Sequence, residues 1–163
     1  MIQHLAISNP RTYLYSILFV VGNIVVPQLC HLIPQGGLML LPIYFFTLIA
    51  AYQYGMTAGM LTAILSPVVN HIFFGMPALA VLPILLIKSS LLAIVAALVA
   101  QRAGKVSLGA VALCVVAYQL AGACFEWPMT GSLMAALQDI RLGYPGLLIQ
   151  TFGGYFMLKI LQK

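Results

Sequence analysis

The stretch LSPVVNHIFFGMPALAVLPILLIKSS, residues 65–90, decides the fold. Two apolar runs flank a Gly-Met-Pro turn at residues 75–77, and such glycine and proline residues punctuate helical segments. Each run continues outside the stretch to about 20 mainly apolar residues, the length that an α-helix needs to cross a bilayer. The stretch therefore predicts a helical hairpin in a membrane, with Asn70, His71 and Lys88 placed among apolar neighbours.

The composition extends this prediction to the whole chain. Of the 163 residues, 63% are hydrophobic and 6% are charged, against about 25% charged residues in a soluble domain. The apolar residues are spread over the full length, so we expect one membrane domain, residues 1–163, embedded in the lipid bilayer. The first residues, MIQHLAISNPR, are too polar for a cleaved secretory signal. The basic residues that give the net charge of +5 are scattered, so we expect no nucleic-acid partner.

We expect an all-α integral membrane protein with six membrane-spanning helices. The connection before the last span is the longest, and it contains both acidic residues of the chain, Glu126 and Asp139. Its MTGSLMAALQDI segment predicts a short interfacial helix. The expected spans cover residues 12–32, 38–52, 56–74, 79–100, 107–125 and 145–161.

The distribution of basic residues predicts the orientation of these spans. Cytoplasmic loops carry an excess of Lys and Arg, and with six spans both termini lie on one side of the membrane. Only Arg141 lies on the other side, so we expect cytoplasmic termini and an outward-facing long loop. The basic residues on the side of the termini are Arg11, Arg102, Lys105, Lys159 and Lys163.

Lys88 is the most informative polar residue of the sequence. It lies about ten residues into the fourth expected span, and an ionisable group inside a membrane is costly enough to indicate a function by default. It needs an acidic partner, a water-filled cavity or an anionic ligand, and only Glu126 and Asp139 are acidic. Two interpretations stay open: a structural pair of Lys88 with Glu126, or a cationic floor of an outward-facing pocket.

Three further residues have both a structural and a functional interpretation. Asn70 and His71 are neighbours in one helix, so their side chains point about 100° apart and do not both face one cavity. We expect one of them to bond a neighbouring helix. Trp127, the only tryptophan, is either an anchor at the membrane interface or a stacking wall for a flat ligand.

No motif of an enzyme or a metal site is present. The sequence contains no His-Glu-x-x-His, no Gly-x-Ser-x-Gly, no phosphate-binding glycine-rich loop and no Cys-x-x-Cys. We therefore expect a chain that is not an enzyme, has no metal site and holds no cofactor of its own. Proton-driven transport is also disfavoured, because no pair of carboxylates lies within a span.

Residues 55–90, GMTAGMLTAILSPVVNHIFFGMPALAVLPILLIKSS, resemble the substrate-binding S components of energy-coupling factor (ECF) vitamin transporters. Members of that family often have a glycine-rich third span, then a proline, an asparagine, a Gly-Met-Pro turn and an apolar fourth span. The specific match covers about a third of the chain. The matching residues are Gly55, Gly59, Pro67, Asn70, Gly75, Met76, Pro77 and Pro83.

The resemblance implies a mechanism of solute uptake through the cytoplasmic membrane of a prokaryote. An S component captures a vitamin or vitamin precursor on the outer side and delivers it to a transmembrane coupling subunit and two ATPase subunits, which hydrolyse the ATP. The first span here lacks the Ala-x-x-x-Ala pair that many members use for docking. The implied site, together with the polar residues of the third span, comprises His31, Gln35, Asn70, His71, Lys88, Tyr118, Glu126, Trp127 and Gln150.

The charge of the solute follows from the partners of Lys88. Lys88, with Arg141 in the loop, favours a solute that carries a carboxylate or phosphate, whereas a pair with Glu126 would cancel that preference. The main alternative function is an ATP-independent transporter or channel subunit that acts as an oligomer. A membrane enzyme or assembly factor and a purely structural bundle are less favoured, because no catalytic residues are in register and a structural bundle gives Lys88 no role.

Overall fold

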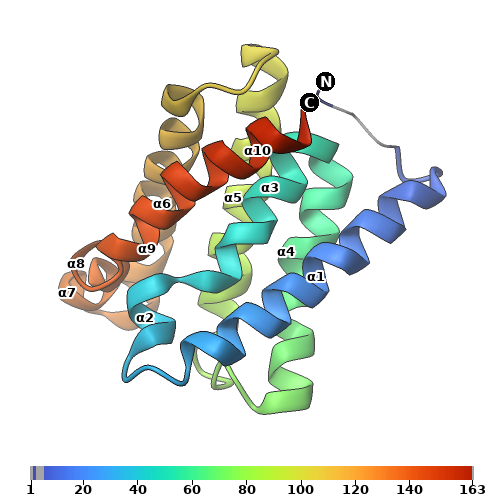
Figure 1. Cartoon of the computed structure of the whole chain (residues 1–163). Coiled ribbons are helices and arrows are strands. Elements are labelled where there is room, and N and C mark those ends of the chain that lie inside the picture. Colours follow the sequence, from blue (N-terminus) through green and yellow to red (C-terminus); the bar gives the residue numbers. More distant parts are fainter. Residues whose placement is uncertain (1, 3–5, 163) are drawn as a thin grey trace.

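The computed structural model describes residues 2 and 6–162, and this part of the chain is helical with no strand, as the sequence predicts. Four of its helices are long and apolar enough to cross a membrane: α1 (Pro10–Cys30), α4 (Met56–Phe74), α5 (Leu82–Ala103) and α6 (Leu108–Thr130) (Figure 1). These four helices indicate a multi-pass membrane protein.

The second and sixth expected spans are interrupted rather than continuous. The second consists of α2 (Gly36–Leu40), a 3₁₀ turn η1 (Pro42–Tyr44) and α3 (Phe45–Tyr54). The sixth consists of α9 (Tyr144–Leu148), a π-helical turn η2 (Ile149–Gly153) and α10 (Gly154–Leu161). Each piece is shorter than the about 20 residues that cross a bilayer, so the structure contains four long helices and two broken helical segments.

The boundaries of the long loop differ from the prediction. Helix α6 continues to Thr130, beyond the expected end at residue 125, so Glu126 and Trp127 are helical and not part of a loop. The expected interfacial helix is absent as one unit, because Gly131 adopts a left-handed conformation and ends α6. Two short helices follow, α7 (Leu133–Ala136) and α8 (Gln138–Arg141). The third expected span, in contrast, matches α4 at both ends.

Helix α1 has its polar residues inside and its apolar residues outside. Thr12, Ser16 and Asn23 are buried against the other helices. This is the reverse of a helix on a soluble domain, whose apolar stripe faces the core, and it is what contact with lipid requires. The large apolar residues of α1 that are exposed are Tyr13, Leu14, Ile17, Leu18, Val21, Val25 and Leu29.

A neutral polar network around Asn23 joins α1 to α3 and α4. The Asn23 amide group donates to the hydroxyl oxygens of Thr47 and Ser66, both at 3.1 Å. Its side-chain oxygen accepts the backbone N–H of Phe46 at 3.3 Å, one of the first N–H groups of α3, which have no partner within the helix. The side chain thus satisfies polar groups of two other helices at a fully buried position.

Asn70 completes this network at a proline. Pro27 lies inside α1 and has no N–H, so the carbonyl one turn earlier, on Asn23, loses its helical partner. The amide of Asn70 donates to that carbonyl at 2.8 Å. The expectation that one residue of the Asn70–His71 pair bonds a neighbouring helix agrees with this geometry.

The connections divide between two ends of the bundle. In Figure 1 the start of α1, the end of α10 and the turn between α5 and α6 lie in the upper half, whereas α2, the connection between α4 and α5, α7 and α8 lie in the lower half. Arg11, Arg102, Lys105 and Lys159 belong to the first group of segments and Arg141 to the second; Lys163 lies outside the described residues. The cytoplasmic location of the first end stays a prediction.

Close packing of α3 against α4 depends on Gly59, a small residue of α4. A Cβ atom added at Gly59 would lie 2.5 Å from the Cβ of Ala51, far closer than two carbon atoms approach. Interfaces between membrane helices are enriched in small residues for this reason. Glycine at this position therefore allows α3 and α4 to pack closely against each other.

Candidate functional site

A cavity of about 590 Å³ lies at the end of the bundle formed by the lower segments of Figure 1. Its walls come from the end of α1, from α2 and η1, from the connection between α4 and α5, and from α5 to α8. The volume falls in the range of about 300–1,000 Å³ that is typical of small-molecule sites. Most of the exposed lining is apolar, but ten of its residues have polar or charged side chains.

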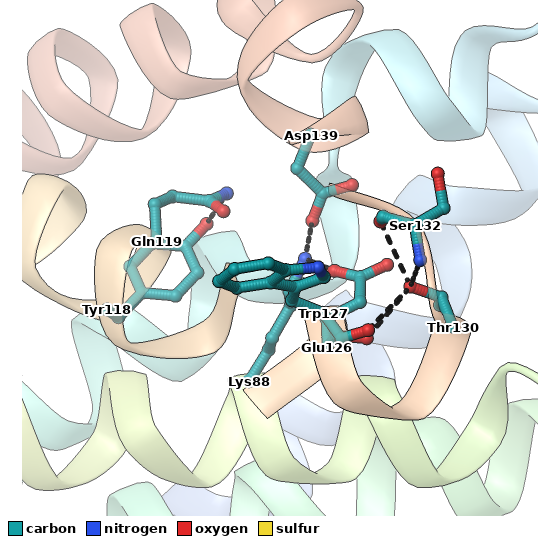
Figure 2. Close-up of polar contacts among 8 residues, drawn as sticks. All are labelled: Lys88, Tyr118, Gln119, Glu126, Trp127, Thr130, Ser132 and Asp139. Atoms are coloured by element: carbon teal, nitrogen blue, oxygen red, sulfur yellow. Dashed lines mark hydrogen bonds and ion pairs between the residues drawn. The ribbon is translucent and has the colours of Figure 1, made fainter. Parts of the chain in front are cut away.

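The charged part of the cavity is a cluster of Lys88, Glu126 and Asp139, which we call the charged cluster. The ammonium of Lys88 on α5 forms ion pairs with Glu126 near the end of α6 and with Asp139 on α8, the latter at 2.8 Å (Figure 2). The Lys88 side chain is 2% exposed, against 13% for Glu126 and 16% for Asp139. The pair of Lys88 with Glu126, one of the two interpretations that the sequence left open, is therefore present, with a second carboxylate added to it.

Helix packing fixes the position of the Lys88 side chain. Gly122 on α6 faces it, and a Cβ atom added there would lie 2.7 Å from the Lys88 Cγ. The aliphatic part of the lysine therefore fills the space that a glycine leaves between α5 and α6. Because the stem is enclosed in this way, the ammonium stays between the two carboxylates.

Irregular backbone also borders the cavity. Gln35 and Leu41, the two non-glycine residues with positive φ in the described part of the chain, both line it, with φ of 59° and 46°. Left-handed backbone at a non-glycine residue is strained and clusters at functional sites. Broken backbone at membrane depth is tolerated only where protein buries it or a cavity is lined by it, and the break at Leu41 meets both conditions.

Two of the predicted ligand residues, Tyr118 and Gln150, lie behind the cavity wall and support this break. The Tyr118 hydroxyl donates to the side-chain oxygen of Gln150 at 2.9 Å, and Gln119 donates to the Tyr118 oxygen at 3.0 Å. The Gln150 amide donates to the carbonyl of Leu41 at 3.3 Å. Tyr118 also packs on Tyr44, a cavity residue, with ring centroids 5.3 Å apart. Tyr118 and Gln150 therefore use their polar groups to hold other parts of the protein in place.

The structure separates Asn70 from His71, as the helical spacing predicts. Asn70 lines the cavity and accepts a hydrogen bond from the Gln28 amide at 3.3 Å. His71 does not line the cavity, and its Nδ1 lies 2.8 Å from the carbonyl oxygen of Pro77, where it ties the turn between α4 and α5. His31, which follows the end of α1, also lines the cavity.

Trp127 and Arg141 do not line the cavity, although the sequence suggested a place for them in the site. Trp127 is 53% exposed and does not line the cavity, which favours the interpretation as an interfacial anchor over that as a stacking wall. Arg141 is exposed and its guanidinium contacts the sulfur of Met134 at 3.8 Å. It adds no positive charge to the cavity lining.

The sequence interpretation did not assign five polar lining residues to the site: Gln28, Tyr44, Thr130, Gln138 and Asp139. Asp139 had a usable signal, because a buried lysine needs acidic partners and the chain has only two acidic residues. Gln28 follows Pro27, whose missing N–H leaves the Asn23 carbonyl without a helical partner, so its position next to a helix irregularity was the available signal. Tyr44 carries no such signal, because its position depends on the break of the second span.

Within residues 2 and 6–162, no group of three or more His, Cys, Asp or Glu could hold a metal ion. No family model, no curated protein and no solved structure matches the chain. The function must therefore be inferred from the cavity and the sequence.

Proposed function

We propose that this chain is the membrane-embedded, high-affinity substrate-capture subunit of an ECF-type importer for a vitamin or vitamin precursor. In this proposal it crosses the cytoplasmic membrane of a prokaryote six times, with both termini inside, and delivers its solute to a coupling subunit and two ATPase subunits. The observation that carries the proposal is the cavity of about 590 Å³, built where backbone is broken and polar side chains converge.

The position of the cavity supports capture from outside. It is bordered by the segments at the end opposite the start of α1 and the end of α10. With cytoplasmic termini this end faces the exterior. The walls combine apolar residues with a few oriented polar groups, the arrangement that selects one small molecule by shape and hydrogen bonding.

The state of the acidic residues favours this function over an ion-coupled transporter. Coupling to a proton or sodium gradient commonly uses intramembrane carboxylates. The chain has two acidic residues, and both belong to the one cluster with Lys88, so no separate carboxylate is left for an ion-coupling site. A capture subunit that relies on separate ATPases needs no ion-coupling group of its own.

The first test is the identity of small molecules that the protein retains. The chain is purified in mild detergent, denatured, and the released compounds are measured by mass spectrometry. Ala135→Trp serves as the control, because Ala135 lines the cavity from α7 and a tryptophan would fill it. We expect a vitamin-like compound at one per chain, and none from the control.

The second test is co-purification from native membranes. We expect a coupling subunit and ATPases to accompany the chain. A retained solute without these partners would favour the alternative, an ATP-independent transporter or channel subunit acting as an oligomer. Absence of both solute and partners would contradict the proposal.

A further inference from the structure

The charges that line the cavity do not balance. Among the described lining residues, Lys88 carries the one full positive charge and Glu126 and Asp139 carry two negative charges. The ion pairs therefore leave a surplus of one negative charge at this site. A solute that carries only negative charge would meet net repulsion there, which is costly in a site of low dielectric constant.

The exposure of the three side chains points in the same direction. The Lys88 side chain is 2% exposed, its stem is enclosed at Gly122, and its ammonium is paired with both carboxylates, so it offers a solute no free positive charge. The side chains of Glu126 and Asp139 keep more exposed surface, 13% and 16%, although the Glu126 Oε2 is buried, and both residues line the cavity. A solute that enters the cavity therefore lies beside two carboxylate side chains, whose oxygens accept hydrogen bonds and attract cations.

The apolar part of the cavity lining indicates the chemical character of the rest of the solute. Leu38, Ile43, Val81, Ile84 and Leu85 supply apolar wall. The cavity is far larger than a metal ion, and no cluster of three metal-binding side chains exists among the described residues. The complementary ligand is an organic molecule with an apolar body and a cationic head.

We infer that the solute captured here is an organic cation whose positively charged group binds on the cavity side of the Glu126 and Asp139 carboxylates, next to the Lys88 ammonium that lies between them. This inference rests on the proposed function and deepens it. Lys88 is then not the binding group that the sequence suggested. It is the internal counterion that lets two carboxylates be buried side by side and aims them at the cavity, and the expected anionic solute gives way to a cationic one.

The experiment uses a deproteinised cell extract of small molecules, separated on ion-exchange resins into a cation fraction, an anion fraction and a neutral fraction. Each fraction is added to the purified full chain in detergent, and the thermal unfolding midpoint is measured. A ligand that binds the folded state raises this midpoint. We expect the cation fraction to raise it and the other two to leave it unchanged.

The outcomes separate the inference from the function on which it rests. Stabilisation by the anion or the neutral fraction alone would overturn the inference and leave solute capture standing. If no fraction stabilises the chain and no compound is released from it, the proposed function fails and the inference falls with it.

Asp139→Asn tests the binding group itself. Asparagine keeps the shape and removes the charge, so we expect the apparent affinity for the active compound of the cation fraction to fall about tenfold. Arg141→Gln is the matched control, because it changes the charge of the same short helix outside the cavity. If Asp139 were only structural, its loss would lower the midpoint without solute and leave the solute-induced rise unchanged.

Discussion

Two regions of the molecule bury polar side chains among apolar helices, and they do so in opposite ways. The Asn23 network is neutral, fully buried and closed, since its amide group and side-chain oxygen are engaged by Thr47, Ser66 and Phe46. The charged cluster is open to the cavity, and its two carboxylates outnumber the one ammonium.

The difference teaches how to separate scaffold from site in a membrane bundle. A buried polar group whose donors and acceptors all bond other helices fixes their packing. Such a group has no free donor or acceptor for a ligand. A group that keeps charge and exposed surface beside a cavity is costly to bury. Its retention is what the binding of a charged ligand would explain.

The largest effect is expected from Lys88→Met. The substitution keeps the stem and removes the counterion of two largely buried carboxylates, which should cost about 3–5 kcal/mol of unfolding free energy. Thermal and chemical unfolding in detergent measure this loss. Lys105→Met is the control, because Lys105 is exposed in the turn after α5. Equal stability of the two variants would show that the charged cluster is not a unit.

The next effect is expected from Asn23→Leu. Leucine removes the amide and leaves the Phe46 N–H without its side-chain acceptor, so we expect a loss of about 1–3 kcal/mol. Retained solute per folded chain, measured by mass spectrometry, should stay at the wild-type value. A variant of normal stability that had lost its solute would place Asn23 in the site and remove the contrast between the two regions.

Asn70→Leu sharpens the boundary, because Asn70 belongs to both regions. It donates to the Asn23 carbonyl at 2.8 Å and also lines the cavity. We expect a smaller loss of unfolding free energy, about 1–2 kcal/mol, together with weaker solute retention. Equilibrium unfolding and mass spectrometry on the same preparation would detect both effects, and a change in only one would assign Asn70 to a single region.

The smallest effect is expected from Trp127→Phe. The side chain is 53% exposed and lies outside the cavity lining, and exposed substitutions of this kind change stability by about 0.5 kcal/mol or less. Solute retention should also be unchanged. A large loss of retained solute would bring back the interpretation of Trp127 as a stacking wall.

The sequence predicted the features that depend on local residue patterns and on the number of acidic residues. The all-α class, the exact extent of the third span and the need of Lys88 for an acidic partner could each be derived from apolar runs, turn residues and the scarcity of acids. The break at Leu41 could not, because its backbone is held by Gln150, 109 residues away in the chain. Tyr118 and Gln150 were assigned to the ligand for the same reason: their polarity was visible, but the long-range partner that uses it was not.

The decisive measurement combines Lys88→Met, Glu126→Gln and Asp139→Asn in one chain and determines both its unfolding midpoint and its retained solute. Removing all three charges leaves no uncompensated ion, so we predict a folded protein of near wild-type stability that retains no solute. A folded triple variant that still holds the wild-type amount of solute would contradict the claim that the charged cluster exists to bind it.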